Sequence, residues 1–382
     1  MLIPVLIEPA YQGTIWAQQT LDGLTAEASR RKYDLRLLNG ERYRDEDYGA
    51  LFGRGRRIAV IMGTSITWVP EVTRFLADIG TAAILISFEP VENFAPHAMV
   101  RMDYAGAMHA MLSYLDGCGR GRIALYGVNP NSSADTIKLR YFQFWCTHRG
   151  TDCDAAVFYN MASLADCCDR FMACHERFNA AICTNDIAAV ALMRRLKARG
   201  LTVPNDLYIA SFGNTLLAQK VTPGITSAVL DHYEMGCQAV HLFSYMHKQK
   251  TLCSISVRVP SRLLVRESTA LSPVPTVAPL LGVDPAAAVN FYNDAEVQRL
   301  SLVEQLLRRA DAIDLALMRA LLAGETYEAL EQRLFLSGNA LKYRKKRLMS
   351  LAQCQTGAQF QAFLADCQAL GMLAAPEDHP FG

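Results

Sequence analysis

Apolar and polar residues alternate along the first two-thirds of the chain in a pattern that predicts strands and helices in turn. Short, nearly continuous apolar runs predict buried strands, and apolar residues at three- and four-residue spacing predict amphipathic helices. We expect strands at residues 2–7, 34–38, 58–62, 83–87, 122–126, 180–183 and 207–211. We expect helices at residues 14–30, 69–79, 104–115, 136–148 and 186–199. This repeated order predicts parallel sheets covered by helices on both faces, and roughly 265 residues are enough for two such sheets.

The pattern changes after the first 269 residues. Residues 270–290 contain four prolines among small residues and have no periodicity, which is typical of a linker. Beyond them the periodicity is helical, and the first helix carries an apolar stripe formed by Val297, Leu300, Val303 and Leu307. We therefore predict an α/β region at residues 1–269, a linker at 270–293 and an all-α domain at 294–375. The stripe is either a dimer surface or the inner face of its own domain.

Composition narrows the class of protein. The 382 residues favour two or three domains, and 51% apolar residues are enough to build buried cores. A charged fraction of 20% and a net charge of +1 indicate that any DNA contact comes from a local basic patch. The apolar N-terminus is short and lacks a basic flank, so it predicts a first strand and not a signal peptide. No apolar stretch approaches the roughly 18 residues of a membrane span.

The chain contains eleven scattered cysteines and no C-x-x-C pair. This usage fits reduced thiols, and we expect a cytoplasmic protein. Cys167, Cys168, Cys174 and His175 could be taken for a metal cluster. Buried structural cysteines are the stronger interpretation, because zinc sites usually show tighter paired spacing. We therefore expect no metal and no cofactor.

The segment that begins at Thr184 carries a family resemblance. It reads TNDIAAVALMRRLKARGLTVPNDLYIASFGNTLLAQKVTPGITSAVLD, and the α/β region closes with the sequence VREST. An Asn-Asp pair opens a helix, a Gly ends it, Val-Pro leads into a strand ending in Ser-Phe, and Thr-Pro-Gly-Ile-Thr follows. This order resembles the effector-binding domain of the LacI/GalR regulators, over residues 2–269. The resemblance implies two α/β lobes joined by three crossovers, with a small sugar-like or purine-like effector between them.

The resemblance also implies six ligand-binding positions. They are Trp16, Asp103, Lys138, Asn185, Asp186 and Phe212. Lys138 stands where the family usually has an Arg that grips ligand hydroxyls or carboxylates, and the Asp186 carboxylate would accept ligand hydrogen bonds. The position after Phe212 is often an Asp in the family and is Gly213 here, which puts the family's usual specificity in doubt.

Each position has a structural alternative. Asn185 and Asp186 are also common helix caps, and Asp103 fits a cap or a hinge. Arg140 lies on the same predicted helix as Lys138 and is an equal candidate for the anion-gripping role. Three further aromatic residues follow apolar runs but carry no motif, so they rank lower: Tyr11, Trp68 and Phe88.

The LacI/GalR regulators carry their helix-turn-helix before the sensor. Here the first strand is predicted at Leu2, so we expect the DNA-binding module at the other end. Residues 316–351 predict a helix ending at Gly324, a second helix, a turn, and a third helix capped by Ser337. The segment LAGETYEALEQRLFLSGNALKYRKKRL resembles the LuxR-type DNA-binding domain. This resemblance extends from Asp311 to a fourth helix near Cys367. One departure is Glu331, where that family usually has Ala.

The third predicted helix concentrates positive charge, with five cations in six positions from Lys342 to Arg347. A recognition helix needs side chains that reach base edges and cations that neutralise phosphates. We predict DNA contacts by Ser337, Asn339, Lys342, Tyr343, Lys345, Lys346 and Arg347. The alternative is a solvated basic helix face.

These observations predict a ligand-responsive transcription regulator that binds double-stranded DNA as a homodimer. Ligand binding would close the two lobes and change the dimer geometry that the DNA-binding modules sense. The alternative is a cytosolic small-molecule-binding module whose helical C-terminus recruits a protein. Nothing in the sequence matches a catalytic motif, so we do not expect an enzyme.

Overall fold

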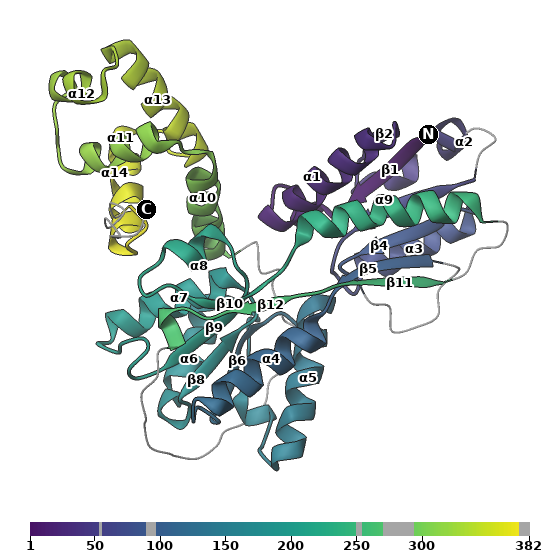
Figure 1. The fold of residues 1–382 in the computed structure, drawn as a ribbon, viewed down its shortest axis with the longest axis horizontal. Helices are drawn as coiled ribbons and strands as arrows, with labels where there is room; N and C mark the ends of the chain where they lie inside the picture. The colour runs from purple at the N-terminus through teal and green to yellow at the C-terminus, as the bar shows by residue number, and fades with distance from the viewer. Residues whose placement is uncertain (53–55, 89–96, 250–253, 270–293, 374–382) are drawn as a thin grey trace.

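Two α/β lobes and a helical unit make up the molecule (Figure 1). The computed structural model describes residues 1–52, 56–88, 97–249, 254–269 and 294–373. The predicted linker at 270–293, and the last two residues of the predicted all-α domain, lie outside these ranges.

The first lobe is built on a parallel sheet with the strand order β11-β5-β4-β3-β1-β2. Its strands are β1 (Leu2–Ile7), β2 (Asp34–Leu38), β3 (Ile58–Met62), β4 (Ala82–Ile86), β5 (His97–Met102) and β11 (Ile255–Val259). Its helices are α1 (Ile15–Arg30), α2 (Tyr48–Phe52), α3 (Trp68–Asp78) and α9 (His232–Lys248).

Successive residues of the central strands face two different cores. On β1, Ile3 and Val5 belong to the core beneath α1 and α9, and Leu6 belongs to the core beneath α3. Side chains alternate across a strand, so a sheet buried on both faces requires apolar residues at every position. This is why the predicted strands are continuous apolar runs.

The second lobe has the strand order β12-β10-β9-β8-β6-β7, parallel except for β12. Its strands are β6 (Ile123–Val128), β7 (Val157–Tyr159), β8 (Ala180–Cys183), β9 (Tyr208–Gly213), β10 (Thr226–Val229) and β12 (Arg262–Leu264). Its helices are α4 (Tyr104–Gly117), α5 (Ser133–Arg149), α6 (Leu164–Met172), α7 (Asp186–Ala198) and α8 (Leu216–Lys220).

The chain crosses between the lobes three times, as predicted. The crossings lie between β5 and α4, between β10 and α9, and between β11 and β12. All the strands and helices that the sequence predicts in this region are confirmed, with ends that shift by a few residues. Strands such as β11 and β12 were not expected, because they are half-exposed edge strands without a continuous apolar run.

The helical unit follows the second lobe in the chain. Its helices are α10 (Ala295–Arg309), α11 (Ala312–Leu322), α12 (Tyr327–Leu334), α13 (Gly338–Leu351) and α14 (Gly357–Ala369). Asp294, Asp311, Thr326, Ser337 and Thr356 cap the first turns of these helices with side-chain oxygens, which explains where each helix begins. No helix in the described ranges is both long and apolar enough to cross a membrane.

The apolar stripe on α10 is buried within this one chain. Val297, Leu300 and Val303 are at most 2% exposed, and α10 packs on α7 and α8 of the second lobe and on α13 of the helical unit. The interpretation of the stripe as a dimer surface is therefore wrong. Its apolar residues instead attach the helical unit to the sensor.

Candidate functional site

A cavity of about 140 Å³ lies between the lobes, at the carboxyl ends of several strands. Ligands of open α/β sheets bind at this edge, where loops and helix N-termini converge. The lobes touch beside the cavity: the Ser133 amide donates to the Thr64 carbonyl (2.7 Å), and the Ile66 amide donates to the Asn131 carbonyl (3.1 Å). The cavity is therefore closed on this side. Its size suits a small ligand, because drug-sized sites measure roughly 300–1,000 Å³.

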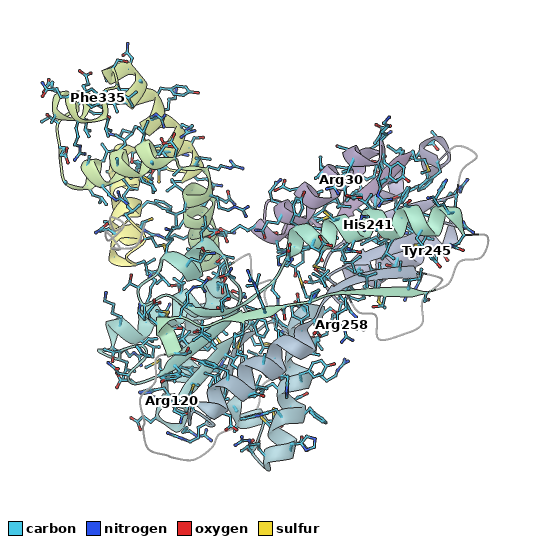
Figure 2. All side chains as sticks on the ribbon, in the orientation of Figure 1. Arg30, Arg120, His241, Tyr245, Arg258 and Phe335 are labelled. Atoms are coloured by element: carbon cyan, nitrogen blue, oxygen red, sulfur yellow. The ribbon has the colours of Figure 1, made fainter. Side chains whose placement is uncertain are left out.

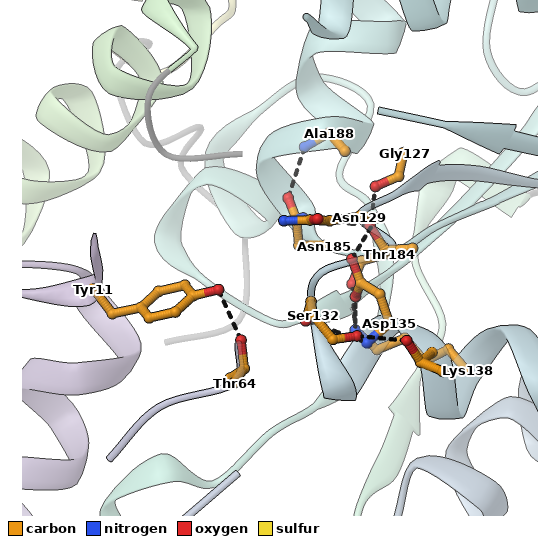
Figure 3. Close-up of polar contacts among 11 residues, drawn as sticks. Tyr11, Thr64, Gly127, Asn129, Ser132, Asp135, Lys138, Thr184, Asn185 and Ala188 are labelled. Carbon is orange, nitrogen blue, oxygen red and sulfur yellow. Dashed lines mark hydrogen bonds and ion pairs between the residues drawn. The ribbon is translucent and has the colours of Figure 1, made fainter. Parts of the chain in front are cut away.

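The first lobe supplies an aromatic wall to this cavity. Trp16, at the start of α1, lies 5.5 Å from the Tyr11 ring and 6.1 Å from the His232 ring, centroid to centroid. The Tyr11 hydroxyl oxygen accepts a hydrogen bond from Thr64 Oγ1 at 2.8 Å, which holds the Tyr11 ring in place (Figure 3). Trp16 thus lines the cavity as predicted, and Tyr11, which ranked lower, lines it as well.

Lys138 lines the opposite wall, but its charge is already balanced. The side chain is buried, and its ammonium donates to Asp135 Oδ1 at 2.8 Å and to the Thr184 carbonyl at 2.9 Å (Figure 3). The ammonium also lies about 5 Å from the ring centroids of Tyr104 and Phe212. Within the protein this ammonium neutralises Asp135, and its contact with ligand hydroxyls or carboxylates stays a prediction. The equal candidate on the same helix, Arg140, is not among the lining residues.

Asp186 is likewise engaged inside the protein. Its carboxylate is 1% exposed and accepts hydrogen bonds from the hydroxyls of Ser211 and Ser227 and from the Thr215 amide (2.7 Å). Burial raises the pKa of this carboxyl above its usual range, and the hydrogen bonds partly offset the rise. These hydrogen bonds give Asp186 a structural role in holding the loop after β9, and its role as a ligand acceptor stays a prediction.

Two other predicted ligand residues are helix caps. Asn185 accepts the Ala188 amide at 2.9 Å and caps α7, while its side chain still borders the cavity (Figure 3). Asp103 accepts the Gly106 amide at 3.1 Å, caps α4 and pairs with Arg258 at 3.5 Å. Asp103 is not among the lining residues, so the structure corrects its expected ligand contact to the cap-or-hinge alternative.

Gly213 lines the cavity and explains the departure from the family pattern. Its φ is +130°, and a Cβ at this position would lie 2.8 Å from Asp186 Oδ2. An L-residue is strained in this conformation, and an acidic one would also face the Asp186 carboxylate. The backbone at Gly213 is therefore incompatible with the family's Asp.

Two buried polar atoms at the cavity have no hydrogen-bond partner within the described part of the chain. They are Nδ1 of His232 and Oγ1 of Thr215. Burial and, to a lesser extent, the charge of Lys138 lower the pKa of His232 to about 4, so the imidazole is neutral at pH 7. Unsatisfied buried polar groups are rare, and here they indicate where a ligand could donate or accept.

Several lining residues were missed because they belong to no motif. Thr64, Ser87 and Asn129 each lie within two residues of the end of a strand, and His232 opens α9 at a crossover. The signal available in the sequence was their place as polar residues just beyond apolar runs. Trp68 and Phe88, the two other low-ranked aromatic residues, are not among the lining residues.

Two of the four candidate metal ligands are packed in the core. Cys167 and Cys168 are buried on α6, and burial raises the pKa of both thiols. Across the ranges that the structure describes, no three His, Cys, Asp or Glu side chains are grouped to hold a metal ion.

Helix α13 has two distinct faces. Its exposed face carries Asn339, Lys342, Tyr343 and Lys346, at helical positions i, i+3, i+4 and i+7. We call these four residues the outer stripe. Leu341 and Leu348 are buried on the other face, and Lys345 lies 5.9 Å from the Tyr327 ring centroid on α12. Of the seven predicted DNA-binding residues, four therefore share one exposed face.

The remaining cations of α13 have partners inside the helical unit. Arg344 pairs with Asp311 and Asp314 at 2.8 Å each, and Arg347 pairs with Asp314, whose side chain is fully buried. Ser337 caps α13 by accepting the Ala340 amide. These contacts give Arg347 and Ser337 a role inside the unit, and their predicted contacts with DNA stay a prediction.

Glu331 lies against the beginning of α13. A Cβ at position 338 would collide with its carboxylate, so Gly338 is the residue that makes room for it. A carboxylate at a helix N-terminus is favourable, because the helix dipole is positive there. The turn before α13 therefore has room for Glu331 at the position where the LuxR-type domain usually has Ala.

Comparisons with known proteins agree with the two-lobed fold. Residues 113–269 match the family model of the periplasmic binding protein-like domain. Catabolite control protein A of Priestia megaterium is 25% identical over 252 residues, covering 65% of this chain and 76% of that protein. The solved structure of a putative transcriptional regulator LacI from Bacillus cereus subsp. cytotoxis NVH 391-98 has a TM-score of 0.62 and 17% identity, covering 71% of this chain and 99% of that one.

A transcriptional regulator CelR–cellobiose complex has a TM-score of 0.59 and 19% identity, covering 70% of this chain and 84% of that one. Together these similarities confirm the periplasmic-binding-protein-like fold that we predicted for the lobes. The match to the family model ends at residue 269, before α10 begins. The LuxR-type character of the helical unit stays a prediction.

Proposed function

We propose that this chain, with its periplasmic-binding-protein-like sensor, is a ligand-responsive transcription regulator. In this proposal a small molecule occupies the cavity between the lobes, and the helical unit binds duplex DNA as a helix-turn-helix of the LuxR type. The similarity to proteins named as transcription regulators supports this function over an enzymatic one.

The cavity favours a neutral, hydroxylated ligand with one flat face. Lys138 is balanced by Asp135, so the described lining residues offer no unpaired cation to a carboxylate or phosphate. Trp16 offers a ring for stacking, and neutral His232 and Thr215 offer unpartnered polar atoms. A sugar satisfies both requirements, and a purine nucleobase is the next best fit. The similarity to a regulator solved with cellobiose supports the first choice.

The outer stripe carries the DNA-binding part of the proposal. Asn reads adenine through two hydrogen bonds, Lys reads guanine or neutralises phosphate, and an exposed aromatic ring packs on thymine methyl groups. Tyr343 is 71% exposed and lies between Lys342 and the paired Arg344. Phe335 is 92% exposed at the turn before α13, at the end of the unit farthest from the lobes (Figure 2). A recognition helix preceded by an exposed turn accounts for these unusual exposures.

The partners we propose are duplex DNA and a second copy of the chain. One module with two outer lysines makes few phosphate contacts and would bind weakly at physiological salt, so a homodimer on a two-fold operator is expected. Closure of the lobes around the ligand would shift the population of the DNA-binding arrangement. The alternative, in which the helical unit recruits a protein partner, predicts no affinity of the outer stripe for DNA.

The test is duplex binding by the full chain, using a fragment selected from a random-sequence pool and a series of salt concentrations. The variant K342A/K346A is expected to weaken binding roughly tenfold or more and to make the salt dependence shallower by about two counterions. The matched control K197A/K248A removes two exposed lysines from the sensor and should bind like the native chain.

Failure of the native chain to select any duplex at low salt would contradict the DNA-binding role and favour the protein-partner alternative. A K342A/K346A chain that binds like the native one would place the interface elsewhere. Repeating the titration with millimolar cellobiose, sucrose, glucose, ribose or hypoxanthine tests responsiveness, since an effector must change the apparent Kd for DNA.

A further inference from the structure

Helix α10 forms part of the cavity wall, although it lies beyond the sensor in the chain. Ser301 is among the lining residues, together with residues from both lobes. Four residues later, Gln305 reaches the first lobe, where its side-chain amide donates to the Gly13 carbonyl at 3.3 Å. Gly13 belongs to the loop that leads into α1 and Trp16. One helix of the helical unit therefore contacts both the cavity and the lobe that closes it.

A buried carboxylate joins α10 to the second lobe. Glu304 is 1% exposed, and its two oxygens accept the amides of Leu216 (3.0 Å) and Leu217 (2.6 Å). Those amides begin α8, which packs against α10. Hydrogen bonds to a buried charge are strong and short-ranged, so a shift of this loop displaces α10 or breaks these bonds.

The same loop is held from the cavity side by Asp186. The Thr215 amide donates to Asp186 Oδ2 at 2.7 Å, directly before the two amides that Glu304 accepts. Three consecutive amides thus bridge a cavity-lining carboxylate and a carboxylate of α10. Thr215 also carries the unpartnered hydroxyl at the cavity. A ligand that forms a hydrogen bond with this hydroxyl would contact the same segment, residues 215–217, that donates hydrogen bonds to Glu304 of α10.

The other end of the connection is α13. Helix α10 packs on α13, and Arg299 of α10 pairs with Asp366 of α14. At its beginning, α10 is anchored to the second lobe: Asp294 accepts the Leu164 amide at 2.8 Å, and Glu296 pairs with Arg194 at 3.1 Å. A helix held at its start and bonded near its end can transmit a tilt to the elements packed on it.

We infer that α10 forms a wall of the ligand cleft. We also infer that a ligand-induced shift of the 215–217 loop moves α10 through Glu304, and that α10 passes this movement to α13 within one chain. The inference rests on the proposed function in that it takes the cavity to be a ligand site. It adds a direct route of communication that does not depend on a second copy of the chain. Glu304 acts here as a positioning residue, since it lines neither the cavity nor the outer stripe.

The test perturbs the cavity side and measures the helical unit, by hydrogen–deuterium exchange on the full chain. D186N weakens the hold on the Thr215 amide, and exchange in peptides covering α10 and α13 should rise roughly tenfold, as expected from the loss of a charged hydrogen bond. In the E304Q background, D186N should add no further change there. D103N, a change of another helix cap beside the cleft, should leave α10 and α13 like native.

Where D186N unfolds the chain, S227A replaces it, because it removes only one donor from the same carboxylate. Exchange that rises in α7 and α8 while α10 and α13 stay within about twofold of native would overturn the inference. Equal effects of D186N with and without E304Q would also overturn it. Exchange needs no DNA, so coupling in a chain without DNA affinity would refute the proposed function alone. DNA binding without coupling would refute this inference alone.

Discussion

Gly213 shows how one residue constrains both the backbone and the chemistry of the cleft. Its φ of +130° lies in a region that side chains other than glycine rarely adopt, and its missing Cβ leaves room for the Asp186 carboxylate. That carboxylate then accepts the Thr215 amide and the two serine hydroxyls. Asp186 therefore has a structural role in this loop through its internal hydrogen bonds.

We expect G213A to lower the free energy of unfolding by about 1–3 kcal/mol, because the new Cβ is both strained and too close to Asp186. Urea denaturation of the full chain measures the change. G117A is the matched control: it lies at the end of α4 with no atom within 4 Å of its Cβ position, so it should be neutral or slightly stabilising. Equal stability of the two variants would remove the argument from strain.

Helix α13 illustrates how one element divides its cations between two tasks. Lys342 and Lys346 are exposed on the outer stripe, whereas Arg344 and Arg347 lie toward Asp314 on α11. Asp314 is fully buried and completes the capping box of α11 with Asp311. A buried carboxylate without its cations is costly, so the two arginines hold α13 in place on α11.

The variant R344A/R347A should therefore destabilise the helical unit by about 1–3 kcal/mol, a value reduced for the partial exposure of both guanidinium groups. K342A/K346A removes the same charge from the exposed face and should stay within about 0.5 kcal/mol of native. Thermal unfolding followed by circular dichroism compares them. Similar losses in the two variants would show that α13 does not divide its cations in this way.

At the scale of the whole molecule, Glu304 joins the sensor and the helical unit through a buried carboxyl group. Burial, which outweighs the opposing hydrogen bonds from the Leu216 and Leu217 amides, raises its pKa to about 7. The unfolded carboxyl titrates near its ordinary value of 4.5. Between these values the folded chain keeps a proton that the unfolded chain releases, so stability falls as pH rises through this window and levels off above it.

We expect native stability to decrease relative to E304Q by up to a few kcal/mol between pH 5 and pH 8. Chemical denaturation of both proteins at several pH values gives this difference directly. Titrations shared by the two chains, such as that of His232, cancel in the subtraction. Parallel stability curves would mean that Glu304 keeps an ordinary pKa in the folded protein.

Apolar periodicity was sufficient to predict the two α/β lobes, the helices of the C-terminal unit and the cap at Ser337, because strand burial, helix faces and caps depend on residues close together in sequence. Five of the six ligand positions implied by the family resemblance line the cavity: Trp16, Lys138, Asn185, Asp186 and Phe212. Edge strands such as β11 escaped prediction, since half-exposed strands lack a continuous apolar run.

Only the tertiary structure decided which polar side chains already have hydrogen-bond partners inside the protein. Asp186 meets Ser211 and Ser227, and α10 meets α8, only after segments far apart in the sequence have packed together. The same is true of Lys138, whose second acceptor is the Thr184 carbonyl 46 residues away. Sequence patterns state which groups are present. Whether a buried group is free for a ligand depends on partners that the fold alone brings within hydrogen-bonding distance.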